Sequence, residues 1–383
     1  MEQLPSPSGT PVARDDALSL TAPPWVQFAG EDTIAAWDAL AHAASEPNPF
    51  YESWYLLPSL RALDPAGAVV LLVLRAQGEL VGLLPVRREP RYYGHRLPHW
   101  RNWVHANCFA GHPLVARGYE RAFWNAALDW FDHRSGSALF LHLAQCPLGG
   151  PLHHALREEL AARPRRAATV LCEERALLET TLAPEDYLVA SLSGKKRKEL
   201  RRQHRRLAEE GTLDITRHHD ATGVRDWAEA FLALERRGWK GAAGSALACD
   251  RRTTALFVEA LEGAAQRGRL ERLALRLDGR PIAMLASFLA PPGAFSYKTA
   301  FDEDYARFSP GVLLQAENLA LIERPDLAWV DSCAAQDHPM IDHFWRERRA
   351  IACHSIAIGG ALRRALFGAL LRREKSATHG GIA

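Results

Sequence analysis

The residues with the clearest capacity for chemistry form a helix start at Ser309-Pro310-Gly311. Serine is a favoured N-cap, and proline suits the first helical position, where its missing N–H group costs nothing. A helix start with glycine next to it leaves backbone N–H groups and the positive end of the dipole open to an anion such as pyrophosphate. The same three residues are also simply an efficient way to begin a helix. The residues expected to form the anion site are Arg307, Phe308, Ser309, Pro310, Gly311, Val312 and Leu313.

Several residues near this helix could transfer protons. Asp331 is either a general base or the cap of the following turn. His338 is a second candidate base because histidine titrates near neutrality, although a turn histidine would look the same. Tyr297 and Tyr305 could each protonate a leaving group, and we include Tyr297 among the catalytic candidates. Arg348 could pair with Asp331, hold a carboxylate of a substrate, or be one of many surface arginines.

Four more residues are candidates for substrate contacts. Lys298 lies in an otherwise apolar strand, where it could meet an anionic group or face solvent. Trp239 and Lys240 follow an expected helix, and they either line a site or anchor the end of that helix. His105 is expected to contact substrate if two domains face each other across a cleft.

Between Lys195 and Arg206, eight of twelve residues are lysine or arginine. Leu200, His204 and Leu207 fall on one face at helical spacing. The cations suit a phosphate-rich partner such as tRNA, coenzyme A or an anionic lipid surface. A solvated helix with one apolar stripe is the alternative. The net charge of the whole chain is only +2, so any basic site must be local.

The histidines and cysteines do not suggest a metal site. His95, His99, His105 and His112 have no helical register and no accompanying carboxylate cluster. The six cysteines form no CxxC pair, which argues against a disulfide framework and against a zinc site built on paired cysteines. We therefore expect no metal and a reducing cytoplasmic environment.

The surrounding pattern predicts two α/β halves that share one order of elements. Gln77-Gly78 and Asp278-Gly279 each separate two apolar runs, which is typical of a hairpin. The expected strands are 68–76, 79–87, 103–109, 138–143, 167–178, 213–217, 270–277, 281–289, 294–300, 328–331 and 354–358. The expected helices are 25–63, 119–133, 152–162, 185–210, 223–237, 251–267 and 310–322. We expect tandem domains, each with a mixed, mostly antiparallel sheet flanked by helices.

The expected boundaries divide the chain into four parts: a disordered lead at 1–24, domains at 25–180 and 181–360, and a basic amphipathic tail at 361–383. The lead is rich in proline, serine and alanine and has no apolar signal segment. The tail places Leu362, Leu366 and Leu370 opposite arginines, and it would lie on a membrane surface or pack on its own protein. No apolar run approaches the roughly 20 residues that cross a bilayer.

Ordered blocks over the second half carry a resemblance to a known family. The blocks include KKRKELRR at 195–202, LERRGWKG at 234–241, YKTAFD at 297–302, FSPGVLL at 308–314, and further matches at 277–283, 330–334, His338 and 345–348. This half resembles the GNAT acyltransferases of the CelD-like branch, named after cellulose-biosynthesis proteins, and more distantly the FemABX peptidyltransferases. The resemblance implies a tandem GNAT-like fold and direct transfer of an acyl group from acyl-coenzyme A to an amine, linked to polysaccharide or cell-envelope synthesis.

The helix start departs from the usual GNAT pyrophosphate loop, Arg/Gln-x-x-Gly-x-Gly/Ala. Arg307 is present, but Val312 and Leu313 occupy positions that are usually small. The pattern is closer to the Fem-like form, which implies aminoacyl-tRNA as an alternative donor. A non-catalytic assembly protein that keeps the fold is a third alternative. In the first half, the matching helix begins at Gly118-Tyr119-Glu120, where the carboxylate would repel an anion, so we expect the second half to be catalytic and the first to be degenerate.

Overall fold

The computed structural model describes residues 18–163, 165–338 and 340–379. Most of the lead expected to be disordered lies outside these residues, but its last part does not. Strand β1 (Leu18–Thr21) pairs antiparallel with β2 (Val70–Ala76), and Leu20 packs against the core. Ordered structure therefore begins before the boundary expected at residue 24, because the edge of β2 offers backbone partners to these residues.

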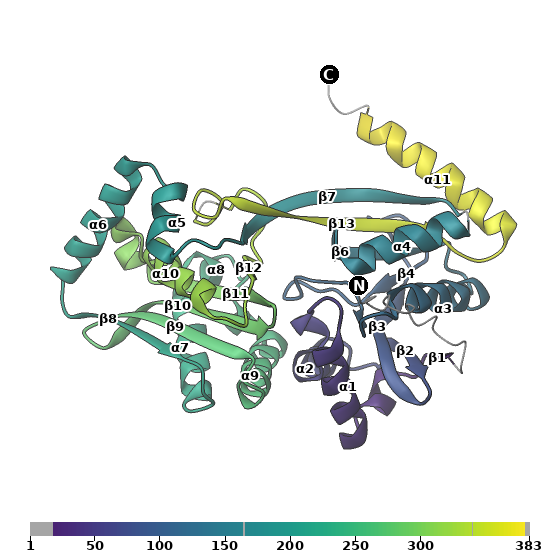
Figure 1. The fold of residues 1–383 in the computed structure, drawn as a ribbon, viewed down its shortest axis with the longest axis horizontal. Coiled ribbons are helices and arrows are strands. Elements are labelled where there is room, and N and C mark those ends of the chain that lie inside the picture. The colour runs from purple at the N-terminus through teal and green to yellow at the C-terminus, as the bar shows by residue number, and fades with distance from the viewer. Residues whose placement is uncertain (1–17, 164, 339, 380–383) are drawn as a thin grey trace, which may run out of the picture.

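Within the described residues, one sheet of thirteen strands runs through the whole molecule (Figure 1). The strand order is β1-β2-β3-β4-β6-β13-β7-β12-β11-β10-β9-β8, with β5 beside β3. The pairs β4–β6 and β11–β12 are parallel and the others are antiparallel, so the mixed, mostly antiparallel α/β architecture is confirmed. The remaining strands are β3 (Glu79–Glu89), β4 (His99–Asn102), β5 (Leu114–Val115), β6 (Phe140–Pro147), β7 (Ala167–Leu178), β8 (Leu213–His218), β9 (Leu270–Leu277), β10 (Arg280–Ala290), β11 (Gly293–Phe301), β12 (Trp329–Asp331) and β13 (Glu347–Ala357).

The helices cover both faces of this sheet, and none of those described is long and apolar enough to cross a membrane. They are α1 (Glu31–Ala43), α2 (Ser53–Leu63), α3 (Glu120–His133), α4 (Pro151–Ala162), α5 (Pro184–Ser191), α6 (Gly194–Ala208), α7 (Val224–Arg237), α8 (Trp239–Ala242), α9 (Arg251–Gln266), α10 (Pro310–Asn318) and α11 (Ala361–His379). Short 3₁₀ helices include η4 (Glu303–Phe308).

Three predictions of single elements were wrong. The helix expected at 25–63 is broken where Asn48 caps the short turn that Pro49 begins. The helix expected at 185–210 is two helices, because the side chain of Ser193 accepts a hydrogen bond from the backbone of Lys196 and starts α6. The strand expected at 103–109 lies earlier in the chain, as β4, and is followed by turns.

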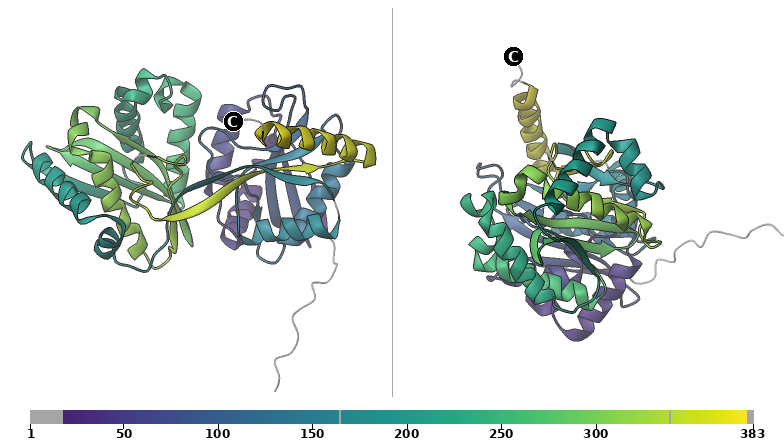
Figure 2. Two further views of the ribbon diagram at one scale, coloured as in Figure 1. Left: turned by 90° about the horizontal axis from the view of Figure 1, so that it is seen from above. Right: turned by 90° about the vertical axis from the view of Figure 1, so that its left-hand side faces the viewer.

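Two long strands, β7 and β13, join the halves (Figures 1 and 2). At one end β13 pairs with β6 of the first half, whereas the end of β7 pairs with β12 of the second half. Strand β13 was expected inside the second domain, at 181–360, but it completes the sheet of the first half. The division at residue 180 therefore does not follow the topology, because a strand's own pattern does not show which edge it will pair with.

The two halves also share one hydrophobic core. Phe50 and Tyr55 of the first half pack against Phe288, Phe295 and Tyr297 of the second, with ring centroids 5.7–6.2 Å apart for the pairs that Phe50 makes with the second half. Each aromatic side chain buries about 150–250 Å². Separating the halves would expose this cluster, so the halves form one folding unit at their contact.

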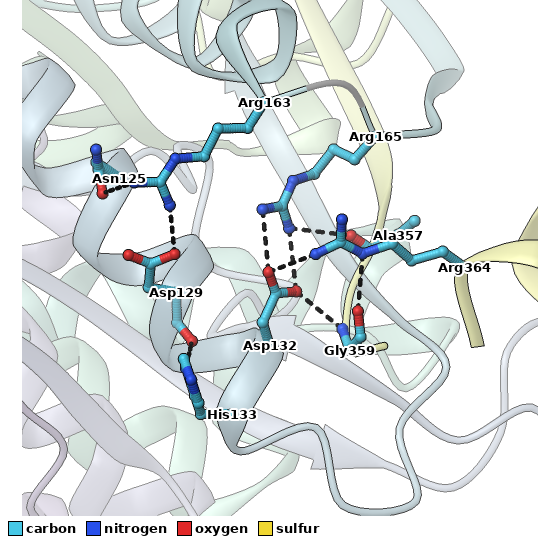
Figure 3. A network of polar contacts seen from close by, with 9 residues as sticks. All are labelled: Asn125, Asp129, Asp132, His133, Arg163, Arg165, Ala357, Gly359 and Arg364. Atoms are coloured by element: carbon cyan, nitrogen blue, oxygen red, sulfur yellow. Dashed lines mark hydrogen bonds and ion pairs between the residues drawn. The ribbon is translucent and has the colours of Figure 1, made fainter. Parts of the chain in front are cut away.

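Helix α11 is fastened to the first half rather than free in solution. Asp132 on α3 accepts hydrogen bonds from Arg165, Arg364 and the backbone of Gly359 (Figure 3). The buried face of α11 carries Phe367, which packs on Phe140 at 5.3 Å, and Leu371.

The apolar stripe expected along the C-terminal tail was misplaced. Leu362 and Leu366 are 91% and 52% exposed. The face that packs is set by the anchoring contacts of Phe367 and not by the spacing of leucines alone.

Candidate active site

A cavity of about 230 Å³ opens where β11 and β12 separate. These two strands pair in parallel over only three residues each, ending at Phe295 and Asp331. Beyond that point β11 continues to Phe301, whereas the chain after Asp331 turns away through Cys333, whose φ is +52°. The cavity lies between the two diverging backbones, and both therefore present polar groups to it.

Five of the residues predicted from the sequence line this cavity: Tyr297, Lys298, Trp239, Lys240 and His338. They come from β11, from α8 and from the segment after β12. Phe109 of the first half closes one side. The fold thus brings together residues that are up to about a hundred positions apart in the second half.

Lys240 is held in the wall of the cavity by a partly buried ion pair. Its Nζ atom lies 2.8 Å from Oε1 of Glu235, and Oε2 of Glu235 accepts the backbone N–H of Leu247 at 2.8 Å. The same Nζ lies 3.4 Å from the carbonyl oxygen of Thr299 on β11. Trp239 stands exposed at the rim. The corner between α7 and α8 is therefore fixed against β11.

Lys298 differs from Lys240 in having no carboxylate within 4 Å among the described residues. Its ammonium lies 5.1 Å from the ring centroid of Phe109 and 5.6 Å from that of Tyr297. Burial, reinforced by the charge of Lys240, lowers the pKa of Lys298 to about 8. At neutral pH it is a mostly protonated cation in a largely apolar setting.

His338 and Tyr297 are the groups of the cavity that could exchange protons. Burial lowers the pKa of His338, with Lys240 adding to the effect, so its ring is neutral at pH 7. Its Nδ1 atom is buried and makes no hydrogen bond within the described part of the chain. The hydroxyl of Tyr297 lies 3.2 Å from that of Tyr55, and burial raises the pKa of Tyr297, so it stays a phenol. Tyr305 packs in a different apolar cluster.

Cys333 lines the cavity and was missed by sequence reasoning. Burial, together with the negative charge of Asp331, raises the pKa of this thiol well above its usual value. A cysteine between small residues is ordinarily a buried apolar residue, so the sequence held no signal for its position. The group is a neutral thiol and not a thiolate.

Asp331 does not line the cavity; it holds two strands together. Its side chain is 0% exposed, and its oxygens lie 2.8 Å from two nitrogens of Arg175 on β7 and 3.2 Å from Arg349 on β13. Oδ1 also accepts the backbone N–H of Cys333 at 2.9 Å. With both oxygens occupied, Asp331 is positioned as a structural ion-pair partner, and the role of general base expected for it has no geometric support.

Two other expected contacts also fall elsewhere. Arg348 does not pair with Asp331; its guanidinium binds Asp342 and the carbonyl oxygens of residues 342, 345 and 347. The neighbouring Arg349 makes the expected pair, because alternate residues of a strand face opposite sides. His105 stacks on Tyr55 with ring centroids 6.2 Å apart and does not line the cavity.

The start of α10 lies beside the cavity, under Met340. A Cβ atom on Gly311 would meet the sulfur of Met340 at 2.8 Å, so a larger residue here would require the flexible end of Met340 to shift. Met340 lines the cavity and also a second hollow of about 190 Å³ that includes Ser309, Val312 and Lys196. Ser309 has a φ of +52° and does not cap α10 with its side chain, which instead accepts a hydrogen bond from Gln203 on α6.

The remaining residues of the expected anion site serve other purposes. Arg307 pairs with Glu210 at 2.9 Å, and Phe308 and Leu313 are buried in the apolar cluster beneath α10. Helix α6 runs next to the second hollow. Its exposed cations without an ion pair among the described residues are Lys195, Lys196, Lys198, Arg201 and Arg206. The described part of the chain as a whole contains no cluster of three or more histidine, cysteine or carboxylate side chains that could hold a metal ion.

Two solved structures are similar to this chain in overall fold at low sequence identity. FemX is similar in structure, with a TM-score of 0.54 at 10% identity over 85% of this chain and 96% of its own. The C-terminal domain of a putative lysylphosphatidylglycerol synthetase from Agrobacterium fabrum gives 0.53 at 13% identity, over 90% of this chain and 95% of its own. A tandem GNAT protein from the clavulanic acid biosynthesis pathway gives 0.44 at 18% identity, over 90% of this chain and 100% of its own.

No curated protein matches this sequence. Residues 194–338, which include α6, α10, β11, β12 and His338, match the model of the acetyltransferase (GNAT) domain family.

Proposed function

We propose that the protein is an N-acyltransferase that moves an acyl group from an acyl-coenzyme A thioester directly to an amine. The observation that carries the proposal is the separation of β11 and β12, which opens a cavity beside the start of α10. Beyond Phe295 the edge of β11 is no longer paired with β12, so backbone N–H groups along this edge would suit the growing negative charge on a thioester oxygen.

The phosphates of the donor would bind at the start of α10 and along the cations of α6. The helix dipole and the lysines act on the same charge, and Lys196 and Ser309 line the same hollow. Met340 borders both this hollow and the cavity, so a donor reaching from one to the other would pass it. A side-chain shift of this flexible methionine is all that such a passage requires.

The chemical step needs a neutral amine and a proton acceptor. The amine nitrogen attacks the thioester carbonyl carbon, the C–S bond breaks, and the sulfur leaves as a thiolate. His338, which lines the cavity, is the candidate to accept the amine proton, because its lowered pKa keeps the ring neutral at pH 7. Tyr297, which stays protonated, is the candidate to supply a proton to the thiolate.

The state of Cys333 supports direct transfer over an acyl-enzyme. A nucleophilic cysteine works as a thiolate, usually beside a cation or a helix start. Here burial and the carboxylate of Asp331 hold Cys333 as a thiol. Cys333 is therefore not an activated nucleophile that could carry the acyl group as a covalent intermediate.

Ligand-induced stabilisation tests the donor. A donor present at a hundredfold excess over its Kd stabilises the folded protein by about 2.7 kcal/mol. We expect a shift of the melting temperature with acetyl- or longer acyl-coenzyme A, and release of free thiol when an amine is added. The matched pair Gly311→Glu and Gly311→Ala separates charge from bulk at the start of α10. Absence of any shift over a series of acyl-coenzyme A compounds would refute the proposal.

A second candidate donor is an aminoacyl-tRNA, and the unpaired cations of α6 favour it. It predicts binding of charged tRNA that weakens steeply with salt, without stabilisation by acyl-coenzyme A. A protein that responds to neither donor would be a non-catalytic assembly protein. None of the three structures compared above is named for cellulose synthesis, and the proposed link to polysaccharide or cell-envelope synthesis rests on the sequence resemblance alone.

A further inference from the structure

Lys298 is a cation of the cavity that has no carboxylate partner of its own. Glu235, Glu303, Lys240 and Lys298 all line the cavity. Glu235 is paired with Lys240 at 2.8 Å, and its other oxygen accepts a backbone N–H group. Glu303 accepts the backbone N–H of Trp239 at 2.6 Å. Lys298 has no carboxylate within 4 Å among the described residues.

The surroundings of Lys298 do not replace a counter-ion. Its ammonium lies over the rings of Phe109 and Tyr297. The distances from Nζ to the two ring centroids are both more than 5 Å. Such cation–π contacts contribute about 0.5–2 kcal/mol, but they leave the three N–H donors of an ammonium without oxygen acceptors. Lys298 is partly exposed at the cavity wall, so an anionic group of a ligand in the cavity can supply the acceptor that the described residues do not.

We propose that Lys298 binds a carboxylate on one of the two substrates, so that the enzyme selects a carboxylate-bearing acyl group or a carboxylate-bearing amine. The inference rests on the proposed acyltransferase function and names its substrate class. The phosphates of a donor have a separate binding place at α10 and α6, so the partner of Lys298 is a different anion. The cavity, at about 230 Å³, is smaller than the roughly 300–1,000 Å³ of common ligand pockets, so the group is small.

The cation at position 298 would also favour the reactive form of an amine. A positive charge a few ångströms away disfavours a protonated amine and therefore lowers its pKa. An amine that carries a carboxylate would gain an ion pair with Lys298, and the same positive charge would favour binding of the amine in its neutral form. Recognition and activation of the acceptor would then depend on the same charge.

The test follows Lys298 directly by NMR with lysine labelled at Cε. The chain has six lysines, so the signal of Lys298 is assigned by its loss in Lys298→Met. Two matched probe pairs distinguish the source of the carboxylate: succinyl- against butyryl-coenzyme A for the donor, and alanine against alaninamide, added with acetyl-coenzyme A, for the acceptor. We expect the Lys298 signal to move with one carboxylate compound and not with its neutral counterpart. Lys298→Met should weaken that compound roughly 10- to 100-fold and the neutral one little.

Lys198→Met is the control for loss of a positive charge. Lys198 is exposed on α6, so this variant should weaken both members of the donor pair equally and leave the preference intact. If acyl-coenzyme A binds but neither carboxylate compound moves the Lys298 signal, the inference is wrong and the proposed function stands. If alanine moves the signal while no acyl-coenzyme A stabilises the protein, the inference holds and the donor is wrong. If neither response occurs, both are wrong.

Discussion

Replacing Asp331 with asparagine separates a structural ion pair from a catalytic base. The side chain is fully buried and bonded to Arg175, Arg349 and the backbone of Cys333, and these contacts join β12 to β7 and β13. Asparagine has the same shape and keeps one oxygen, but it removes the charge that compensates two guanidinium groups. Removing one partner of a buried ion pair costs about 3–5 kcal/mol. Because asparagine keeps some of the hydrogen bonds, we expect a loss of about 3 kcal/mol.

The assay is urea unfolding followed by tryptophan fluorescence, with Asp250→Asn as the control. Asp250 also pairs with an arginine, Arg252 at 2.7 Å, and its side chain accepts a backbone N–H at the start of α9. Its side chain is 40% exposed, and asparagine caps helices as well as aspartate does. Exposed pairs contribute little to stability, so the control should lose much less than Asp331→Asn. The comparison isolates burial, since the chemical change is identical.

Activity measured with the same two variants completes the test. If Asp331 shapes the cavity wall, Asp331→Asn lowers the unfolding midpoint and reduces turnover. The pH profile of the remaining activity then keeps both its acidic and its basic limb. If Asp331 were the general base, the variant would lose activity and the acidic limb of the profile with normal stability. That second result, or a stability loss no larger than that of Asp250→Asn, would refute the structural assignment.

Four further changes give distinct expectations. Because the pKa of Cys333 is raised, Cys333→Ser should keep the rate of acyl transfer within a few-fold. For the same reason, mass spectrometry of the wild type should find no acylated Cys333, and a trapped acyl-cysteine would contradict this. Gly311→Glu should abolish binding of acyl-coenzyme A in calorimetry, and Gly311→Ala should weaken this binding less. Both side chains meet Met340, but only glutamate adds a negative charge at a helix start. His338→Gln should remove the fall in kcat/KM that the wild type shows below pH 6.5, where a ring with a lowered pKa becomes protonated; an unchanged acidic limb would exclude His338 as the base. Lys298→Met should raise the free energy of unfolding at pH 7 by up to about 3 kcal/mol, since the pKa of Lys298 falls from 10.5 to about 8 on folding. That gain should shrink between pH 8 and 10.5, because the wild type becomes more stable as its lysine loses the proton; a gain independent of pH would contradict the cause.

Local signals in the sequence predicted much of the fold. Asp278-Gly279 and Gln77-Gly78 both form the expected hairpins, and in each pair both residues have positive φ, which such turns require. Five of the residues singled out from the sequence line one cavity, because aromatic and charged side chains in a strand or at a helix end are unusual enough to be noticed; their roles stay predictions. These features depend on residues close together in the chain.

The errors concern contacts between distant segments. No local pattern could show that β13 leaves the second half to pair with β6, or that Arg349 rather than Arg348 would face Asp331. The position of Cys333 at the cavity follows from the separation of β11 and β12, which is set by the pairing of β12 with β7. Pairing across a sheet is decided by the whole topology, so such features appear only in three dimensions.

The two halves also differ at the equivalent place, and the difference explains why the cavity lies in the second. In each half a hairpin is followed by a third strand, a helix and a parallel fourth strand: β4, α3 and β6 in the first, β11, α10 and β12 in the second. At the end of β4, Asn102 exchanges two hydrogen bonds of 2.8 Å with the backbone of Ala144 on β6 and donates a third to Gly111, so the strands are bridged where β11 and β12 diverge. At the start of α3, the carboxylate of Glu120 already accepts the backbone N–H of Gly118, so this helix start supplies its own anion. We infer that the first half acts through its shared core, where Tyr55 supports Tyr297, rather than by binding a donor of its own.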